Sequence, residues 1–298
     1  MALKLIATDM DGTLLTDSEK TFDHEFFARL LNRMDEHDIQ FVVASGNQFP
    51  KLLQYMEEFQ GKNILYIAEN GGYIAREDRD ILVSAFSPET VAAVVKVLDR
   101  FPDVGFIISA HEGAYLIRER AEPITRIVRE HLDFLGAEVP QELDYLSFIN
   151  RFYPGTRVIN SLEEMGDAAV VKFALQTHRR DIDNILKELV KLLPANVVPV
   201  ASGFGAIDLV VRGVNKGSAL KWVGQELGIA ADEMIAFGDN SNDLEMLQFV
   251  GEGVAMDNAV PQVKAAADTI IGHNNDGAVL TYIEVKLDQL DSENSESF

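Results

Sequence analysis

The sequence predicts an α/β fold in which a parallel sheet, covered by helices, is interrupted by a second α/β domain. In roughly the first eighty residues, short apolar runs alternate with longer segments that have the apolar spacing of a helix. The same alternation returns near the C-terminus, and the middle of the chain has a different pattern. Strands and helices that alternate in this way are typical of a parallel sheet wrapped by helices.

Three apolar runs near the N-terminus predict buried strands, because none of them alternates with polar residues. They are Leu5–Ala7, Phe41–Ala44 and Ile64–Ala68. The segment between the first two has four apolar residues spaced like one face of a helix. These are Phe26, Leu30, Leu31 and Met34.

Near the C-terminus we expect a helix over Ser218–Leu227, a strand over Met234–Phe237 and a helix over Asp243–Val250. The last segment, Asp288–Phe298, contains four acidic residues and no basic one. We expect this segment to be a frayed, solvated tail.

The middle of the chain predicts an inserted domain. Its expected strands are Phe106–Ile108, Ala114–Ile117, Val170–Leu175 and Ile207–Val211, and the first two form a hairpin. Its expected helices are Glu89–Arg100, Pro123–Phe134 and Asp181–Leu193. We therefore expect a core domain of residues 1–84 and 213–298 and an inserted domain of residues 85–212.

Composition excludes several classes of function. The formal net charge of -22 repels nucleic acids and anionic membrane surfaces, so neither is an expected partner. The chain has no cysteine, which excludes disulfides and thiolate chemistry and fits a cytoplasmic location. No segment has the roughly 18 consecutive apolar residues of a membrane span, so a soluble protein is expected.

The first site candidate is the pair Asp9 and Asp11, at the end of the first predicted strand. Residues two apart on an extended segment point to the same side, and ligands bind beyond the carboxyl ends of parallel strands. Two carboxylates there need a cation or a shared proton, and Mg²⁺ is the natural cation for oxygen ligands. Gly12 permits a sharp turn after the pair. The alternative is an ordinary acidic loop.

Two further candidates could hold a phosphate. Ser45 and Gly46 follow the second strand and offer a hydroxyl and an open backbone N–H, although a plain turn is the alternative. Lys216 lies near a helix start, where the helix dipole disfavours a cation. That position makes sense if the charge faces a phosphate, and the alternative is a solvated surface lysine.

The last candidate is Gly238–Asp243, at the end of another apolar strand. Asp239 is placed to complete a metal site with Asp9 and Asp11. The alternative is a helix N-cap, and both can hold if Asn242 or Asp243 caps while Asp239 binds the metal. The chain therefore contains, in this order, an acidic pair, a hydroxyl, a lysine and a second acidic segment. Each of them lies at the end of a predicted strand or at the start of a predicted helix.

With these four motifs the chain resembles the haloacid dehalogenase superfamily of phosphohydrolases. The matching segments are Asp9–Thr13, Ser45, Lys216 and Asp239–Asp243. The resemblance implies a Rossmann-like parallel-sheet core with an inserted α/β cap of type C2B, as in the Cof-like type IIB group. Finer features resemble the bacterial branch of sugar phosphatases and a flavin-pathway phosphatase. These features are Ala44–Gln48, Glu69–Gly72 and Ser202–Asp208.

The resemblance implies a role for each site residue. Asp9 is implied as the nucleophile that forms an aspartyl-phosphate, and Asp11 as the general acid and base. Mg²⁺ is implied at the Asp9 carboxylate, the Asp11 backbone carbonyl and Asp239. The phosphate is implied to bind Ser45, Gly46, Lys216 and Asn242. Asp243 is implied as a supporting residue.

The expected function is therefore a Mg²⁺-dependent phosphatase of small phosphorylated metabolites, with sugar phosphates as the leading substrates. The first alternative is a phosphatase of flavin mononucleotide or of a phosphorylated flavin precursor. A more remote alternative is a non-catalytic regulator that binds phosphorylated metabolites. In the inserted domain, Phe204 is the candidate for substrate specificity, with a buried structural role as its alternative.

Overall fold

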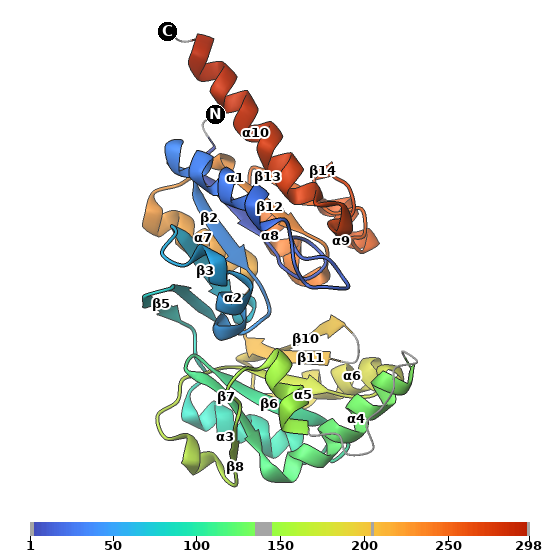
Figure 1. Cartoon of the computed structure of the whole chain (residues 1–298). Helices are drawn as coiled ribbons and strands as arrows, with labels where there is room; N and C mark the ends of the chain where they lie inside the picture. The colour runs from blue at the N-terminus through green and yellow to red at the C-terminus, as the bar shows by residue number, and fades with distance from the viewer. Residues whose placement is uncertain (1–2, 135–144, 204–205, 297–298) are drawn as a thin grey trace. The chain divides into compact units, whose positions relative to one another are not determined.

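The computed structural model describes residues 3–134, 145–203 and 206–296. The chain divides into two compact units (Figure 1). Unit 1 comprises Met1–Gly46, Leu52–Ile81 and Asn215–Phe298. Unit 2 comprises Asn47–Lys51 and Leu82–Val214. Within the described ranges, no helix combines the length and the apolar character that a bilayer span requires.

An eight-stranded sheet forms the centre of unit 1, in the order β14-β13-β12-β1-β2-β3-β4-β5. The strands are β1 Leu5–Thr8, β2 Gln40–Ala44, β3 Ile64–Ala68, β4 Tyr73–Arg76, β5 Arg79–Val83, β12 Met234–Gly238, β13 Glu252–Ala255 and β14 Thr269–Ile270. The six strands from β14 to β3 pair in parallel, and β4 is antiparallel to β3. The predicted parallel sheet is confirmed, and β1, β2 and β3 are buried along their whole length.

Helices cover both faces of this sheet. They are α1 His24–Glu36, α2 Phe49–Tyr55, α7 Lys216–Leu227, α8 Leu244–Phe249, α9 Pro261–Ala266 and α10 Ala278–Glu296. From β1 the sheet grows in two opposite directions, so right-handed crossovers place α1 and α8 on opposite faces. α10 packs beside α1 and α7 packs beside α8 (Figure 1).

α1 shows how local sequence sets one of these helices. The Asp23 side chain caps its first turn by accepting a hydrogen bond from the N–H of Phe26. The buried face consists of Phe27, Leu30, Leu31 and Met34. The predicted face was therefore right at three positions, but Phe27 takes the buried place that was assigned to Phe26.

The expectation of a frayed C-terminal tail is wrong, because α10 continues as a helix to Glu296. Two of its acids, Asp288 and Asp291, have basic partners on α1 and at its C-cap. Arg33 Nη2 lies 2.8 Å from Asp288 Oδ1 and 2.6 Å from Asp291 Oδ2. His37 Nε2 lies 2.7 Å from Asp291 Oδ1. Ion pairs across two helices therefore hold a segment that looked unpartnered in the sequence.

Unit 2 is built on a six-stranded sheet in the order β10-β11-β9-β6-β7-β8. The strands are β6 Gly105–Ala110, β7 Gly113–Ile117, β8 Arg157–Ile159, β9 Val170–Gln176, β10 Val197–Gly203 and β11 Ala206–Val211. The helices are α3 Pro88–Leu98, α4 Ala121–Phe134, α5 Tyr145–Phe152 and α6 Ile182–Leu192. β6 and β7 are antiparallel, as the predicted hairpin requires. Phe204 lies outside the described residues.

Candidate active site

The candidate site lies where the sheet of unit 1 changes its direction of growth. β1 is hydrogen-bonded to β2 on one side and to β12 on the other, all in parallel. Asp9 follows β1, Ser45 follows β2 and Asp239 follows β12. Because the carboxyl ends of parallel strands meet at one edge, the fold brings these predicted site residues to the same edge.

A buried lysine joins two aspartates at this edge. Lys216 Nζ lies 2.6 Å from Asp9 Oδ1 and 2.6 Å from Asp243 Oδ1. The side chain of Lys216 is 0% exposed, as is that of Asp243, and that of Asp9 is 8% exposed. The alternative of a solvated surface lysine is therefore wrong. A charge buried this deeply is tolerated only because it is paired and hydrogen-bonded.

The start of α7 fixes the position of this lysine. Asn215 is the N-cap and forms a capping box with Ser218, so Lys216 is the first residue of the helix, as predicted. Gly217 lets the helix approach α8 closely, because a Cβ there would lie 2.5 Å from the backbone of Glu245. Local capping and a close helix contact together direct the lysine to the end of β1.

The turn after β12 fixes Asp239 and Asp243. Asp243 Oδ2 accepts hydrogen bonds from the backbone N–H groups of Asp239 and Asn240, each at 3.0 Å. Asp239 Oδ1 accepts a hydrogen bond of 3.1 Å from Thr13 Oγ1. Asn240 is the N-cap of the short turn Ser241–Asp243, and Asp243 completes its capping box. Asp243 also takes the N-cap position of α8, as one of the two expected residues, but its side chain makes no capping hydrogen bond to that helix. All of the Asp243 oxygens therefore serve to hold Lys216 and the turn.

Burial and like charges disfavour the ionised forms of the Asp9 and Asp239 carboxyl groups. Burial raises the pKa of Asp9 well above its ordinary value, although the charge of Lys216 opposes the rise. Burial, reinforced by the charge of Asp243, raises the pKa of Asp239 to about 6. Burial also opposes the charge of Lys216, but Asp243 and Asp9 outweigh it, so the pKa of Lys216 is raised. Three carboxyl groups surround one ammonium group, so acidic groups outnumber basic ones in this cluster.

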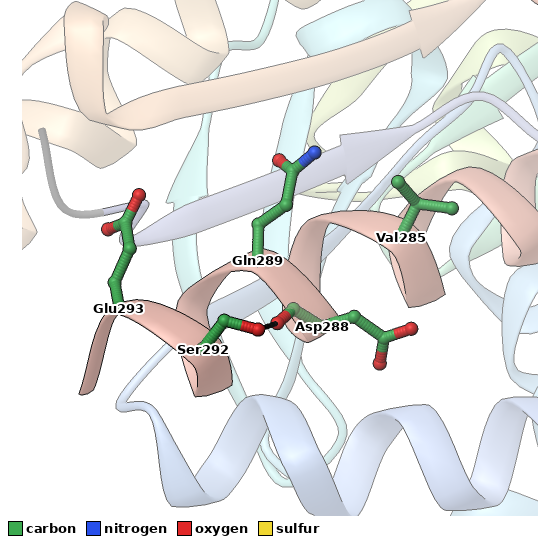
Figure 2. A pocket seen from close by; sticks show the side chains of 5 residues that line it. All are labelled: Val285, Asp288, Gln289, Ser292 and Glu293. Atoms are coloured by element: carbon green, nitrogen blue, oxygen red, sulfur yellow. Dashed lines mark hydrogen bonds between the residues drawn. The ribbon is translucent and has the colours of Figure 1, made fainter. Parts of the chain in front are cut away.

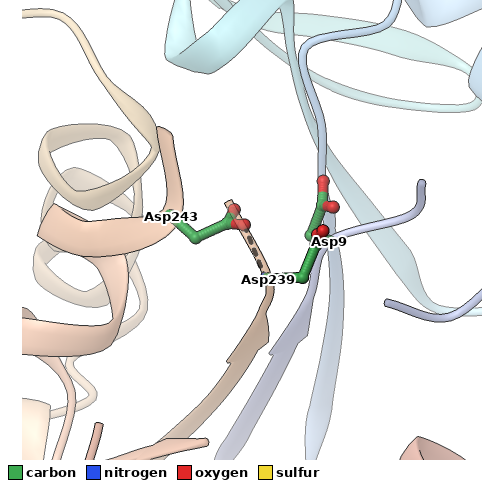
Figure 3. Close-up of side chains that lie close together, drawn as sticks. All are labelled: Asp9, Asp239 and Asp243. Carbon is green, nitrogen blue, oxygen red and sulfur yellow. Dashed lines mark hydrogen bonds between the residues drawn. The ribbon is translucent and has the colours of Figure 1, made fainter. Parts of the chain in front are cut away.

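The donor set fits a hard divalent cation. Asp9, Asp239 and Asp243 each offer a carboxylate oxygen, and these oxygens lie within 4.8 Å of one another (Figure 3). Oxygen ligands suit Mg²⁺, and a double positive charge would balance the excess of carboxylates. Because Asp243 is committed to Lys216 and to two backbone N–H groups, Asp9 and Asp239 are the carboxylates that could hold the ion.

The Asp11 carboxylate lies outside this three-residue cluster. Its Oδ1 is 2.9 Å from Lys20 Nζ, and both side chains are 43% exposed. Gly12 follows with a φ of 78°, and a Cβ there would lie 2.5 Å from Asp239 Oδ2. Only glycine therefore allows the turn after Asp11 to pass this close to the Asp239 carboxylate.

Ser45, Gly46 and Asn242 converge on Asn70. The N–H of Asn70 donates to the carbonyl of Ser45 at 3.0 Å, and Asn242 Nδ2 donates to Asn70 Oδ1 at 2.9 Å. A Cβ on Gly46 would lie 3.1 Å from Asn70 Oδ1. Asn70 itself is buried and adopts a φ of 56°. Three of the four residues predicted to bind phosphate therefore lie around one asparagine after β3, and the fourth, Lys216, lies at Asp9 and Asp243.

Sequence reasoning assigned no role to Asn70, Thr13 or Lys20. The segment Glu69–Gly72, one of the finer features of the family resemblance, is the sequence signal that points to Asn70. Thr13 lies within the first motif. Lys20 pairs with Asp11 because the chain turns back between them, and no sequence pattern predicts that this turn brings the two residues together.

A surface pocket of about 450 Å³ lies elsewhere on unit 1, along α10 (Figure 2). Its lining residues are Val285, Asp288, Gln289, Ser292 and Glu293. None of these belongs to the acidic cluster, so this hollow does not mark the candidate site.

The fold and the cluster define an α/β enzyme with an acidic, lysine-containing site at the carboxyl edge of its parallel sheet. The chain belongs to the haloacid dehalogenase-like hydrolases, since the model of that family matches residues 6–283. The predicted family and the predicted class, a phosphoric monoester hydrolase, are therefore confirmed.

Individual relatives agree with this family. The chain is 33% identical over 286 residues to 5-amino-6-(5-phospho-D-ribitylamino)uracil phosphatase YbjI of Escherichia coli, covering 95% of this chain and 96% of that protein. The crystal structure of SMU.1108c from Streptococcus mutans matches with a TM-score of 0.81 and 28% identity, covering 96% of this chain and 99% of that one. The subclass IIB sugar phosphatase BT4131 matches with a TM-score of 0.72 and 22% identity over 94% of this chain and 98% of its own, a likeness of fold.

Proposed function

We propose that this chain is a Mg²⁺-dependent phosphatase that works through an aspartyl-phosphate on Asp9. The observation that carries the proposal is the buried Lys216, which lies 2.6 Å from the Asp9 carboxylate. An ammonium group at this place orients the carboxylate and offers positive charge to a phosphoryl group that the carboxylate attacks. Asp243 holds the lysine from the other side.

In the first half of the reaction, an Asp9 oxygen attacks phosphorus and the bond from phosphorus to the substrate oxygen breaks. Asp11 gives its proton to that leaving oxygen, which departs as an alcohol. In the second half, Asp11 takes a proton from water, and the resulting hydroxide attacks phosphorus and releases inorganic phosphate and the Asp9 carboxylate. Asp11 is suited to meet solvent and substrate, because its side chain is half-exposed.

Asp9, Asp239 and the backbone carbonyl of Asp11 would hold the magnesium ion. The ion supplies charge neutralisation between the Asp9 carboxylate and an anionic substrate. Ser45, Gly46 and Asn242 would hold the phosphoryl oxygens. Asn70 aligns this group through its hydrogen bonds with Ser45 and Asn242, and it lies where a Cβ on Gly46 would crowd it. We assign residues 85–212, which make up most of unit 2, to the cap that selects the leaving group.

The substrate is proposed from the most informative relative. YbjI is named for a phosphorylated ribitylaminopyrimidine, which favours a flavin-precursor phosphate over the sugar phosphates that the sequence placed first. The two substrates share their reacting end, a primary phosphate ester on a polyhydroxylated carbon chain. We therefore propose the ribitylaminopyrimidine phosphate as the preferred substrate and sugar phosphates as secondary ones.

The test measures phosphate released from 5-amino-6-(5-phospho-D-ribitylamino)uracil, flavin mononucleotide and ribose 5-phosphate, with and without Mg²⁺. We expect the highest kcat/KM for the first compound and no activity after chelation. Asp9→Asn keeps the shape of the side chain but removes the nucleophilic charge, so turnover should fall to background in a folded protein. Normal hydrolysis by a folded Asp9→Asn protein would contradict the mechanism, and higher kcat/KM for ribose 5-phosphate would reverse the substrate order.

A further inference from the structure

Asparagine side chains from the far end of the chain hold the turn after β1. We call Asp9–Asp17 the acid turn. Asn258 Nδ2 donates a hydrogen bond of 2.7 Å to the carbonyl of Gly12, across 246 residues of sequence. Asn274 Nδ2 donates one of 2.8 Å to the carbonyl of Leu15, across 259 residues. Two carbonyl groups of the acid turn therefore find donors outside the turn.

The two asparagines are also joined to each other. The backbone N–H of Asn274 donates to Asn258 Oδ1 at 3.1 Å. Asn258 thus meets a donor at its oxygen and a carbonyl at its nitrogen, and only one orientation of its amide satisfies both. Asn274 is buried, so its hydrogen bonds are shielded from water.

A second set of contacts holds the far end of the acid turn. The Asp17 carboxylate accepts hydrogen bonds from Asn274 Nδ2 at 3.0 Å and from Asn275 Nδ2 at 3.1 Å. The backbone N–H of Asp17 donates to Asn275 Oδ1 at 2.8 Å. These bonds keep the pKa of Asp17 below its ordinary value, Asn274 being the largest cause.

Asp9 and Asp11 depend on this arrangement to different degrees. Asp9 directly follows β1, its N–H donates to the carbonyl of Phe237 at 3.0 Å, and Lys216 holds its carboxylate. Asp11 has left the strand: its backbone forms an isolated bridge with Leu15, and its carboxylate pairs with the half-exposed Lys20. The carbonyl that Asn258 holds belongs to Gly12, the residue after Asp11, so this contact fixes the backbone beside the proton donor.

We propose that Asn258 and Asn274 are positioning residues for Asp11, required for protonation of the leaving oxygen and not for attack by Asp9. The inference rests on the proposed role of Asp11 as the general acid. Loss of the contact to Gly12 frees the backbone next to Asp11. A displacement of about 1 Å there is enough to slow proton transfer by ~10²-fold.

Two substrates with different leaving groups separate the two roles. Ribose 5-phosphate releases an alkoxide that needs a proton, and p-nitrophenyl phosphate releases a stable phenolate that does not. We measure kcat/KM at saturating Mg²⁺, because the backbone carbonyl of Asp11 is also a proposed ligand of the ion. This quantity reports the steps up to departure of the leaving group and is insensitive to later hydrolysis of the aspartyl-phosphate. Asn258→Ala and Asn258→Asp both remove the donor to Gly12, and the second keeps an acceptor for Asn274.

Both variants should lower kcat/KM for ribose 5-phosphate by about 10–100-fold, with less than a ~3-fold change for p-nitrophenyl phosphate. Asn63→Ala is the matched control in unit 1, because Asn63 Oδ1 accepts a hydrogen bond from Arg76. It should change neither value. Asn274→Ala should act like the Asn258 variants; if it does not fold, the half-buried Asn258 decides the question.

Equal losses for both substrates, or no loss for either, would overturn the positioning role. Asp11→Asn, measured in parallel, separates this failure from failure of the proposed function. If Asp11→Asn discriminates between the substrates and the Asn258 variants do not, the inference alone is wrong. If Asp11→Asn does not discriminate either, the role of Asp11 as the general acid is wrong as well.

Discussion

At the scale of single residues, Lys216 balances the charge of the site. It is the ammonium group that contacts both Asp9 and Asp243, at 2.6 Å in each case. Desolvation of a buried ion costs several kcal/mol, and good geometry with a partner is what offsets that cost. The lysine is therefore required for the local structure as well as for the proposed chemistry.

Lys216→Met tests this requirement. The substitution keeps an unbranched side chain but leaves Asp9 and Asp243 without their cation. We expect the free energy of unfolding to fall by about 3–5 kcal/mol, as when one partner of a buried pair is removed. Urea unfolding followed by circular dichroism measures the loss.

Lys191→Met is the matched control, since Lys191 makes an exposed pair with Glu188. It should cost less than ~1 kcal/mol. Equal stabilities of the two variants would mean that the buried pairs contribute no more than a surface pair.

The placement of the candidate site residues could be predicted from the sequence where a motif follows a recognisable strand. Asp9, Ser45 and Asp239 meet at one sheet edge because they follow three parallel strands. This meeting could be predicted because each of the three strands is recognisable as an apolar run. The complete burial of Lys216 could not be predicted, because it results from the approach of α7 to α8. Asn70 and Asn258 are hydrogen-bonded to segments remote in sequence, and no local sequence pattern predicts such contacts.

At the scale of elements, the turn that follows β1 must pass very close to the turn that follows β12. Gly12 has a φ of 78°, and a Cβ on it would lie 2.5 Å from Asp239 Oδ2. Gly61 has nearly the same φ, 76°, but nothing lies within 4 Å of its Cβ position. The two glycines share their backbone conformation and differ in crowding.

Gly12→Ala and Gly61→Ala separate crowding from backbone strain. Each substitution should cost about 1–2 kcal/mol through the left-handed conformation. Only Gly12→Ala should also displace the Asp239 carboxylate, and we expect the magnesium concentration for half-maximal activity to rise about 10–100-fold. A magnesium titration of activity measures this, and the same rise in Gly61→Ala would contradict the proposed metal ligation by Asp239.

Among the elements, the buried central strands were predictable and the short peripheral ones were not. β1, β2, β3 and β12 are apolar runs that lie in the sheet interior. β14 has two residues and is partly exposed, so it leaves little pattern in the sequence. The end of α10 was missed because Asp291 pairs with Arg33 of α1 and with His37 at the C-cap of α1, both distant in sequence.

At the scale of the whole molecule, the acidic chain has a site that is itself short of positive charge. The formal net charge is -22, and three buried or half-buried aspartates share one lysine at the strand ends. Long-range attraction therefore cannot bring an anionic substrate to this protein. The local cations, Lys216 and the proposed Mg²⁺, must supply the attraction at short range.

Because of this charge deficit, we expect the stabilisation of the protein by Mg²⁺ to depend on pH. The pKa of Asp239 is raised from 3.8 to about 6 in the absence of metal. A raised carboxyl pKa means that the unfolded chain loses its proton at lower pH than the folded one, so the metal-free protein loses stability as pH rises from about 4 through about 6. Magnesium binds the deprotonated form and competes with that proton.

The gain in Tm on adding saturating Mg²⁺ should therefore be larger at pH 7.5 than at pH 5, as measured by differential scanning calorimetry. Asp239→Asn removes the titrating group, and in this variant the gain should be small at both pH values. An equal gain at both pH values in the unmodified protein would place the magnesium site away from Asp239.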